Sequence, residues 1–164
     1  MKHEEYIQNI LKKFRRHFDI HESYIIGDYE FDFLAEFHER NEKYFASKKI
    51  TLDAAENNEY CFFKYLENMN KEYFFILSHI LEEAISFLVK PTFEHMSTIL
   101  TCVIISDKIA NDGVIQNIEK YRFNKSFFLN LKGWIKIRFV LVDLTLEKIY
   151  TSKEGGQIEE VYKF

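Results

Sequence analysis

The segment between Ser97 and Ser106 is almost continuously apolar. Its interior reads Thr-Ile-Leu-Thr-Cys-Val-Ile-Ile, and most of these residues are β-branched. Such a run has no polar face to present to water, so it is typical of a central strand that is covered on both faces of its sheet. This segment limits the fold more than any other, because it requires a sheet with a layer on each side.

Two segments have the spacing of amphipathic helices. Apolar residues recur at helical intervals over residues 4–18, and a longer apolar stripe extends over about residues 71–89. We expect the longer helix to cover one face of the sheet and to end before Pro91, because the residue preceding a proline avoids helical geometry. A short helix is expected over residues 114–121, after the capping sequence Asn-Asp-Gly at 111–113.

The remaining elements are expected to be strands. Residues 29–38 alternate in polarity, with Phe31, Phe33, Ala35 and Phe37 on one face, and a period of two indicates a half-buried strand. The polar residues 39–42 predict a hairpin connection, residues 53–58 a turn, and residues 154–156 another turn. Further strands are expected over residues 43–50, 59–66, 126–131, 134–143 and 148–152.

These elements predict one α+β domain over residues 1–164, a length typical of a single domain. The expected sheet is mixed, largely antiparallel and flanked by helices. The order of elements is α-β-β-β-α-β-α-β-β-β.

Composition excludes several classes of protein. The net charge of −4 does not favour nucleic-acid binding by the chain as a whole, and no apolar run approaches the ~20 residues that span a bilayer. The charged first residues do not resemble a secretory signal, so we expect a cytoplasmic protein without a membrane partner. Cys61 and Cys102 are then expected to be reduced thiols in the core. Phosphate-binding loops, Cys-x-x-Cys pairs and Gly-x-Ser-x-Gly are absent from the sequence, and no cofactor is expected.

The segment Tyr29-Glu30-Phe31-Asp32-Phe33-Leu34-Ala35, followed by Ala46-Ser47-Lys48, resembles the core of the PD-(D/E)XK endonuclease superfamily. The order of helix, three strands, helix and strand matches that family over roughly the first two-thirds of the chain. The resemblance implies that Asp32 binds a metal ion and that Lys48 polarises the attacking water. Ala46 stands where the family has a second acid, and its methyl side chain cannot bind a cation.

Two functions are compatible with this resemblance. The loss of an acid at Ala46 favours a non-catalytic binding or interaction protein on a degenerate nuclease-like scaffold. The alternative is a Mg-dependent nuclease acting on DNA or RNA, in which Glu30 or Glu36 replaces the missing acid beside Asp32. A solvent-exposed strand face also accounts for these acids without any chemistry. In general character the chain also resembles small uncharacterised bacterial proteins.

Two further surfaces have alternative interpretations. Lys132, Trp134, Lys136 and Arg138 combine cations with an aromatic ring, as single-stranded nucleic acids require, although any solvated strand face has the same alternation and the tryptophan would also fit in the core. Seventeen Phe, ten Tyr and one Trp exceed what a small core readily buries, so a homodimer is expected unless the core is unusually aromatic. The aromatic residues expected to contribute to that dimer are Phe127, Phe128, Tyr150 and Tyr162.

Overall fold

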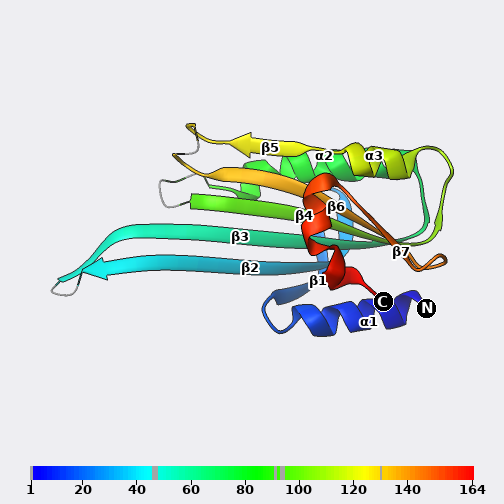
Figure 1. Ribbon diagram of the computed structural model, residues 1–164, viewed down its shortest axis with the longest axis horizontal. Helices are drawn as coiled ribbons and strands as arrows, with labels where there is room; N and C mark the ends of the chain where they lie inside the picture. Colours follow the sequence, from blue (N-terminus) through cyan, green and yellow to red (C-terminus); the bar gives the residue numbers. More distant parts are fainter. Residues whose placement is uncertain (1, 46–47, 91, 93–94, 130) are drawn as a thin grey trace.

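A computed structural model describes residues 2–45, 48–90, 92, 95–129 and 131–164, without the side chains of residues 40–55. The described residues form one seven-stranded mixed sheet with helices on both faces (Figure 1). The elements are α1 (His3–Phe14), β1 (Asp19–Ile26), β2 (Tyr29–Phe45), β3 (Lys48–Met69), α2 (Lys71–Leu88), β4 (His95–Ile109), α3 (Val114–Lys120), β5 (Phe123–Ser126), β6 (Trp134–Asp143), β7 (Lys148–Thr151) and the 3-10 helix η1 (Lys153–Tyr162). The expected α+β class and order of elements are confirmed, with η1 added at the end.

The sheet has the strand order β1-β2-β3-β4-β6-β5, and β7 also pairs with β6. The first three strands form an antiparallel meander. The helix α2 then connects β3 to β4, which pairs with it in parallel, and β6 is parallel to β4. Since β5 and β7 are antiparallel to β6, most of the strand pairings are antiparallel, as expected.

Helices cover both faces of β4, as its continuous apolar sequence requires. On one face α2 buries Phe74, Leu77 and Leu81 in a cluster, here called the α2 cluster, that includes Leu100 and Cys102 of β4. The side chain of Asn70 caps α2 by accepting a hydrogen bond of 3.0 Å from the backbone N–H of Tyr73. Figure 1 shows α2 and α3 behind the sheet and η1 in front of it.

The second core cluster, here called the α1 cluster, lies between the sheet, α1 and η1. It joins Tyr6, Ile10 and Phe14 of α1 to Val103 of β4 and Tyr162 of η1. Cys61 and Cys102 are buried free thiols on β3 and β4, which agrees with the expected core positions. Among the described residues, no helix combines the length and the apolar character needed to cross a membrane.

The three strands of the meander differ in extent from those expected. The connection expected at residues 39–42 lies inside β2, and the turn expected at residues 53–58 lies inside β3. The two polar segments pair with each other, His38 opposite Asn58 and Glu39 opposite Asn57, so backbone hydrogen bonds hold strands that lack apolar alternation. The first strand is β1, which was not among the expected strands, and the strand expected over residues 43–50 is divided between the end of β2 and the start of β3.

Three other boundaries also differ. α1 ends at Phe14, four residues before the expected end, because the chain turns there toward β1. β5 comprises Phe123–Ser126, so among the described residues of the strand expected at 126–131 only Ser126 is in a strand. The turn expected at 154–156 belongs to η1.

Candidate functional site

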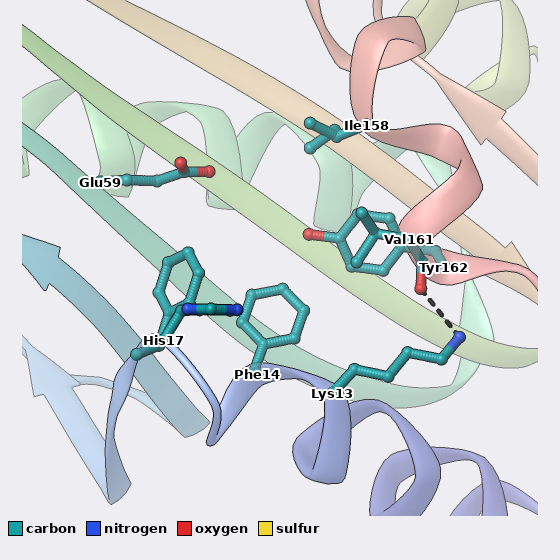
Figure 2. A pocket seen from close by; sticks show the side chains of 8 residues that line it. Lys13, Phe14, His17, Glu59, Ile158, Val161 and Tyr162 are labelled. Atoms are coloured by element: carbon teal, nitrogen blue, oxygen red, sulfur yellow. Dashed lines mark hydrogen bonds between the residues drawn. The ribbon is translucent and has the colours of Figure 1, made fainter.

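A mainly apolar pocket of about 350 Å³ lies between α1, β3 and η1 (Figure 2). Its apolar lining comes from α1, the residues after it and η1: Phe14, Phe18, Ile158, Val161 and Tyr162. Its polar lining consists of Lys13, His17 and Glu59. Figure 2 shows Phe14 facing Tyr162 across the pocket, with Lys13 and Glu59 at opposite ends. We call this cavity the α1–η1 pocket.

Hydrogen bonds between α1 and the end of the chain hold the two walls of this pocket in place. The Tyr6 hydroxyl donates to the backbone carbonyl oxygen of Tyr162 at 2.5 Å. The Lys13 ammonium donates to the carbonyl oxygens of Val161 and Lys163, each at 3.1 Å. These carbonyls lie in the last turn of η1 and directly after it, so the charged side chain fixes the helix end that forms one wall.

A buried ion pair lies at the Glu59 end of the α1–η1 pocket. The side chain of Arg138 is only 6% exposed, and its guanidinium donates one hydrogen bond to Oε1 of Glu59 and another, of 3.1 Å, to Oγ1 of Thr101. The strand register aligns Cys61, Thr101 and Arg138 on neighbouring strands. The carboxylate therefore compensates a guanidinium that would otherwise be buried without a counter-charge.

The titratable groups near this ion pair are held in their neutral forms. The Cys61 thiol lies 3.6 Å from Oε1 of Glu59, and burial raises the pKa of this thiol well above its usual value. Burial also raises the pKa values of the Tyr6 and Tyr162 hydroxyls. Because a thiolate is the reactive form of cysteine, these three groups are suited to packing and hydrogen bonding more than to nucleophilic attack.

Asp32 closes the end of the β2–β3 ladder. The last paired residues are Phe33 and Phe63, and beyond them Oδ2 of Asp32 accepts a hydrogen bond of 2.6 Å from the backbone N–H of Tyr65. Its other oxygen lies 3.3 Å from the Lys64 ammonium. Both carboxylate oxygens therefore contact groups of the protein itself.

The strand face expected for Asp32 does not continue along β2. The β1–β2 ladder omits the pair of Ser23 and Asp32, and Ser23 has a positive φ of 55°. Phe31 packs in the α2 cluster and Phe33 in the α1 cluster, although regular alternation would put both on one face. The expectation that Phe31, Phe33, Ala35 and Phe37 share a face is therefore wrong, because the backbone is irregular at this point.

The structure places the other predicted acids away from Asp32. Glu30 accepts a hydrogen bond from the Ser23 hydroxyl and is exposed. Glu36 lies between His21, at 2.5 Å, and His38, at 3.0 Å. It shares its strand face with Leu34 of the α2 cluster, whereas Asp32 lines a hollow beside α1.

Lys48 begins β3 at the far end of the hairpin, opposite Phe45, so it is distant from Asp32. Ala46 and the side chain of Lys48 lie outside the described residues. The cation beside Asp32 is Lys64. The nuclease motif has an acid two positions before its lysine, but the residue two positions before Lys64 is the buried Phe62. Within the described ranges, no three His, Cys, Asp or Glu side chains are arranged to hold a metal ion.

The four residues expected at a nucleic-acid surface are divided between surface and core. Trp134 is half-buried, and the Lys136 ammonium lies 5.0 Å from the centre of its ring and 3.1 Å from Glu154. Lys132 lies with its ammonium 4.6 Å from the centre of the Phe128 ring. Arg138 is buried, so the solvated position expected for it is wrong: it joins Glu59 under the α1–η1 layer.

Sequence reasoning missed Glu59, which lines the α1–η1 pocket and pairs with Arg138. The available signal was an acid at the start of one apolar strand and an arginine in another.

Residues 2–164 match the model of a family described as a domain of unknown function, DUF8052. No curated protein and no solved structure matches the chain. The chain belongs to the DUF8052 family.

Proposed function

We propose that this protein is a non-catalytic binding protein and that its ligand occupies the α1–η1 pocket. The observation that carries the proposal is a largely apolar cavity whose walls are tied together by the hydrogen bonds of Tyr6 and Lys13. Preformed apolar cavities with a few convergent polar groups are the usual form of small-molecule sites. The volume of about 350 Å³ is at the small end of the range of roughly 300–1,000 Å³ that is usual for such sites.

The lining indicates the chemistry of the ligand. Five apolar side chains favour an apolar body, and the carboxylate of Glu59 supplies the one anionic group. Oε1 of Glu59 is occupied by Arg138 and Cys61, whereas Oε2 makes no hydrogen bond among the described residues. We infer a small, mainly apolar ligand with one hydrogen-bond donor that reaches Oε2.

Three observations support binding over hydrolysis. The thiol beside Glu59 is held neutral, the Asp32 carboxylate is occupied by Tyr65 and Lys64, and Phe62 stands two residues before Lys64. On this proposal the nuclease-like resemblance concerns the order of elements and a degenerate scaffold. Asp32 then stabilises the end of the β2–β3 ladder and binds no metal.

The homodimer remains part of the proposal, but with different contact residues. Of the four aromatics expected there, Tyr162 is buried, Phe127 and Tyr150 are partly buried against the α2 cluster, and Phe128 is exposed. The exposed large apolar side chains on α2 are Tyr73, Phe75, Ile76 and Phe87. These residues are the better candidates for a contact between two copies.

The ligand site is tested with 1-anilinonaphthalene-8-sulfonate, a fluorescent probe that brightens in apolar cavities. We expect saturable binding to the wild type and an affinity at least about tenfold lower in Val161→Trp, whose side chain would fill the pocket. Leu146→Trp, at another exposed apolar position, is the matched control and should bind as the wild type does. Equal affinity in Val161→Trp and Leu146→Trp would refute the site.

A further inference from the structure

The loop between β5 and β6 exposes large apolar side chains at its end. Phe128 is 71% exposed, Leu129 94% and Leu131 68%. We call these three residues the β5–β6 tip. β5 is an outer strand of the sheet, and the loop leaves it at that edge (Figure 1). Isolated apolar residues are common on protein surfaces, but a cluster of this kind indicates a contact with an apolar phase or partner.

Hydrogen bonds hold the base of this tip. The Phe127 N–H donates to the carbonyl oxygen of Gly133 at 2.9 Å, and the Lys132 N–H donates back to Phe127 at 3.2 Å. The buried His95 donates from Nδ1 to the carbonyl oxygen of Lys132 at 2.8 Å, since a carbonyl only accepts. The exposed side chains therefore project from an anchored hairpin.

The backbone of the tip is strained. Phe128 and Leu129 have positive φ values of 47° and 51°, a region that bulky residues rarely adopt. Strain of this kind persists only where the surrounding structure enforces it, and it concentrates at functional positions. Here it turns two consecutive large apolar side chains away from the core.

Two lysines lie beside the tip and its base, and acids are absent from the surrounding sequence. No Asp or Glu occurs between Lys120 and Val142, whereas the chain as a whole has a net charge of −4. The ammonium of Lys125 lies 5.4 Å from the centre of the Phe127 ring, and that of Lys132 lies 4.6 Å from the centre of the Phe128 ring. One lysine therefore lies against the tip residue Phe128, and a second lies against Phe127 at the base of the tip.

We propose that the β5–β6 tip inserts into the headgroup region of an anionic lipid bilayer, with the adjacent lysines contacting lipid phosphate and carboxylate groups. Apolar side chains combined with lysines are the usual means by which a protein binds at a membrane surface without crossing it. This replaces the expectation of no membrane partner, which rested on the lack of a spanning segment.

A second copy of the chain fits the same tip poorly. A two-fold interface places the same patch on both partners, so Lys125 and Lys132 of each copy would approach those of the other. The three exposed side chains are also too few for the ~800 Å² per partner that a stable interface buries.

Co-sedimentation with lipid vesicles tests this inference. We expect the wild type to bind vesicles of phosphatidylcholine with phosphatidylserine and not vesicles of phosphatidylcholine alone. The double variant Phe128→Ser/Leu129→Ser should lower the partition coefficient at least about tenfold, because it removes two inserted side chains. Lys125→Glu/Lys132→Glu should weaken binding similarly, by reversing the charge. Ile25→Ser/Leu146→Ser, at two exposed apolar positions outside the tip and outside α2, is the matched control and should bind as the wild type does.

Several results would overturn the inference. They are an absence of wild-type binding to anionic vesicles, equal binding to neutral vesicles, or undiminished binding by the tip variant. An equal loss in the Ile25→Ser/Leu146→Ser control would show non-specific adhesion and would also overturn it. Sedimentation velocity without lipid provides a further test: a change of oligomeric state in the tip variant, with no vesicle binding by the wild type, would assign the tip to a second copy. The tip variant should still bind 1-anilinonaphthalene-8-sulfonate in the α1–η1 pocket. A failure of vesicle binding can therefore be told apart from a failure of the proposed ligand site.

Discussion

The guanidinium of Arg138 donates a hydrogen bond to the carboxylate of Glu59, joining β6 to β3 across the intervening strand β4. Arg138 also donates to Thr101 of β4, so its side chain contacts all three central strands. Neither partner can be removed alone without leaving a charge poorly compensated in a place with little access to water.

We expect Glu59→Ala to lower the free energy of unfolding by about 2–3 kcal/mol, less than the ~3–5 kcal/mol typical of a fully buried pair because the Glu59 side chain is 26% exposed. The double variant Glu59→Leu/Arg138→Met should recover most of that loss, since it buries no charge. Urea denaturation measures both. Lys136→Met removes the more exposed pair with Glu154 and should cost less than about 1 kcal/mol; an equal cost for the two single variants would contradict this account.

The sequence predicts the elements that are buried on both sides. β6 has the expected bounds, α2 ends one residue from its expected end, and β4 is longer than expected but central. Continuous or helically spaced apolar residues indicate burial directly, so the structure of these segments can be predicted without knowing which segments pack against them. The polar parts of β2 and β3 have no such signal, because backbone pairing alone determines their structure.

The candidate site required information that one segment does not contain. Glu59 and Arg138 are 79 residues apart in the sequence. They meet because their strands, β3 and β6, lie on either side of β4, an arrangement that requires α2 to return the chain between β3 and β4. Asp32 was correctly placed on a strand, but the irregularity opposite Ser23 changes which face its neighbours occupy. A positive φ at a serine has no reliable sequence signal.

The pH dependence of stability should include a contribution from His38. Burial alone would lower its pKa, but hydrogen bonds with Asn58 and Glu36 and the charges of Glu36 and Asp19 raise it overall. A pKa raised by folding gives stability that is complete below the unfolded value of about 6.5 and is lost as pH rises through the folded value. We therefore expect the unfolding free energy to fall as pH rises from roughly 6 to 8.

Urea denaturation across that pH range measures this contribution. His38→Gln should flatten the dependence, because glutamine does not titrate. His79→Gln is the comparison variant at a histidine exposed on α2, 3.2 Å from Glu83, and it should flatten the dependence less than His38→Gln does. A slope that persists in His38→Gln would assign the pH dependence to other groups.

The binding proposal predicts that the purified protein does not cleave nucleic acids. Duplex, branched and single-stranded DNA, and RNA, should remain intact with Mg²⁺ or Mn²⁺, because the Asp32 carboxylate is occupied by Tyr65 and Lys64. Gel electrophoresis checks this, with Asp32→Asn as the comparison. Cleavage that stops both on adding EDTA and in Asp32→Asn would instead establish the Mg-dependent nuclease.

Self-association is predicted to involve the outer face of α2. Phe75, 53% exposed, lies there beside Ile76. Sedimentation velocity should show a dimer for the wild type and a monomer for Phe75→Glu, because an isologous contact would bury two identical carboxylates facing each other. Phe128→Glu is the comparison at another exposed aromatic and should stay dimeric. A monomeric wild type would contradict this prediction.

Gly133 should be the glycine that tolerates a side chain least. Its φ is 79°, and an added Cβ would lie 2.5 Å from both Nδ1 and the carbonyl oxygen of His95. Gly27 has a similar φ of 59°, with nothing within 4 Å of an added Cβ, so Gly27→Ala bears only the backbone cost of about 1 kcal/mol. Gly133→Ala adds a clash with backbone and with a buried ring, and we expect it to cost at least about 1 kcal/mol more in urea denaturation. Because His95 anchors the β5–β6 loop, the same variant should weaken vesicle binding, whereas Gly27→Ala should not; equal stability losses in the two variants would mean that the loop moves away from His95 without cost.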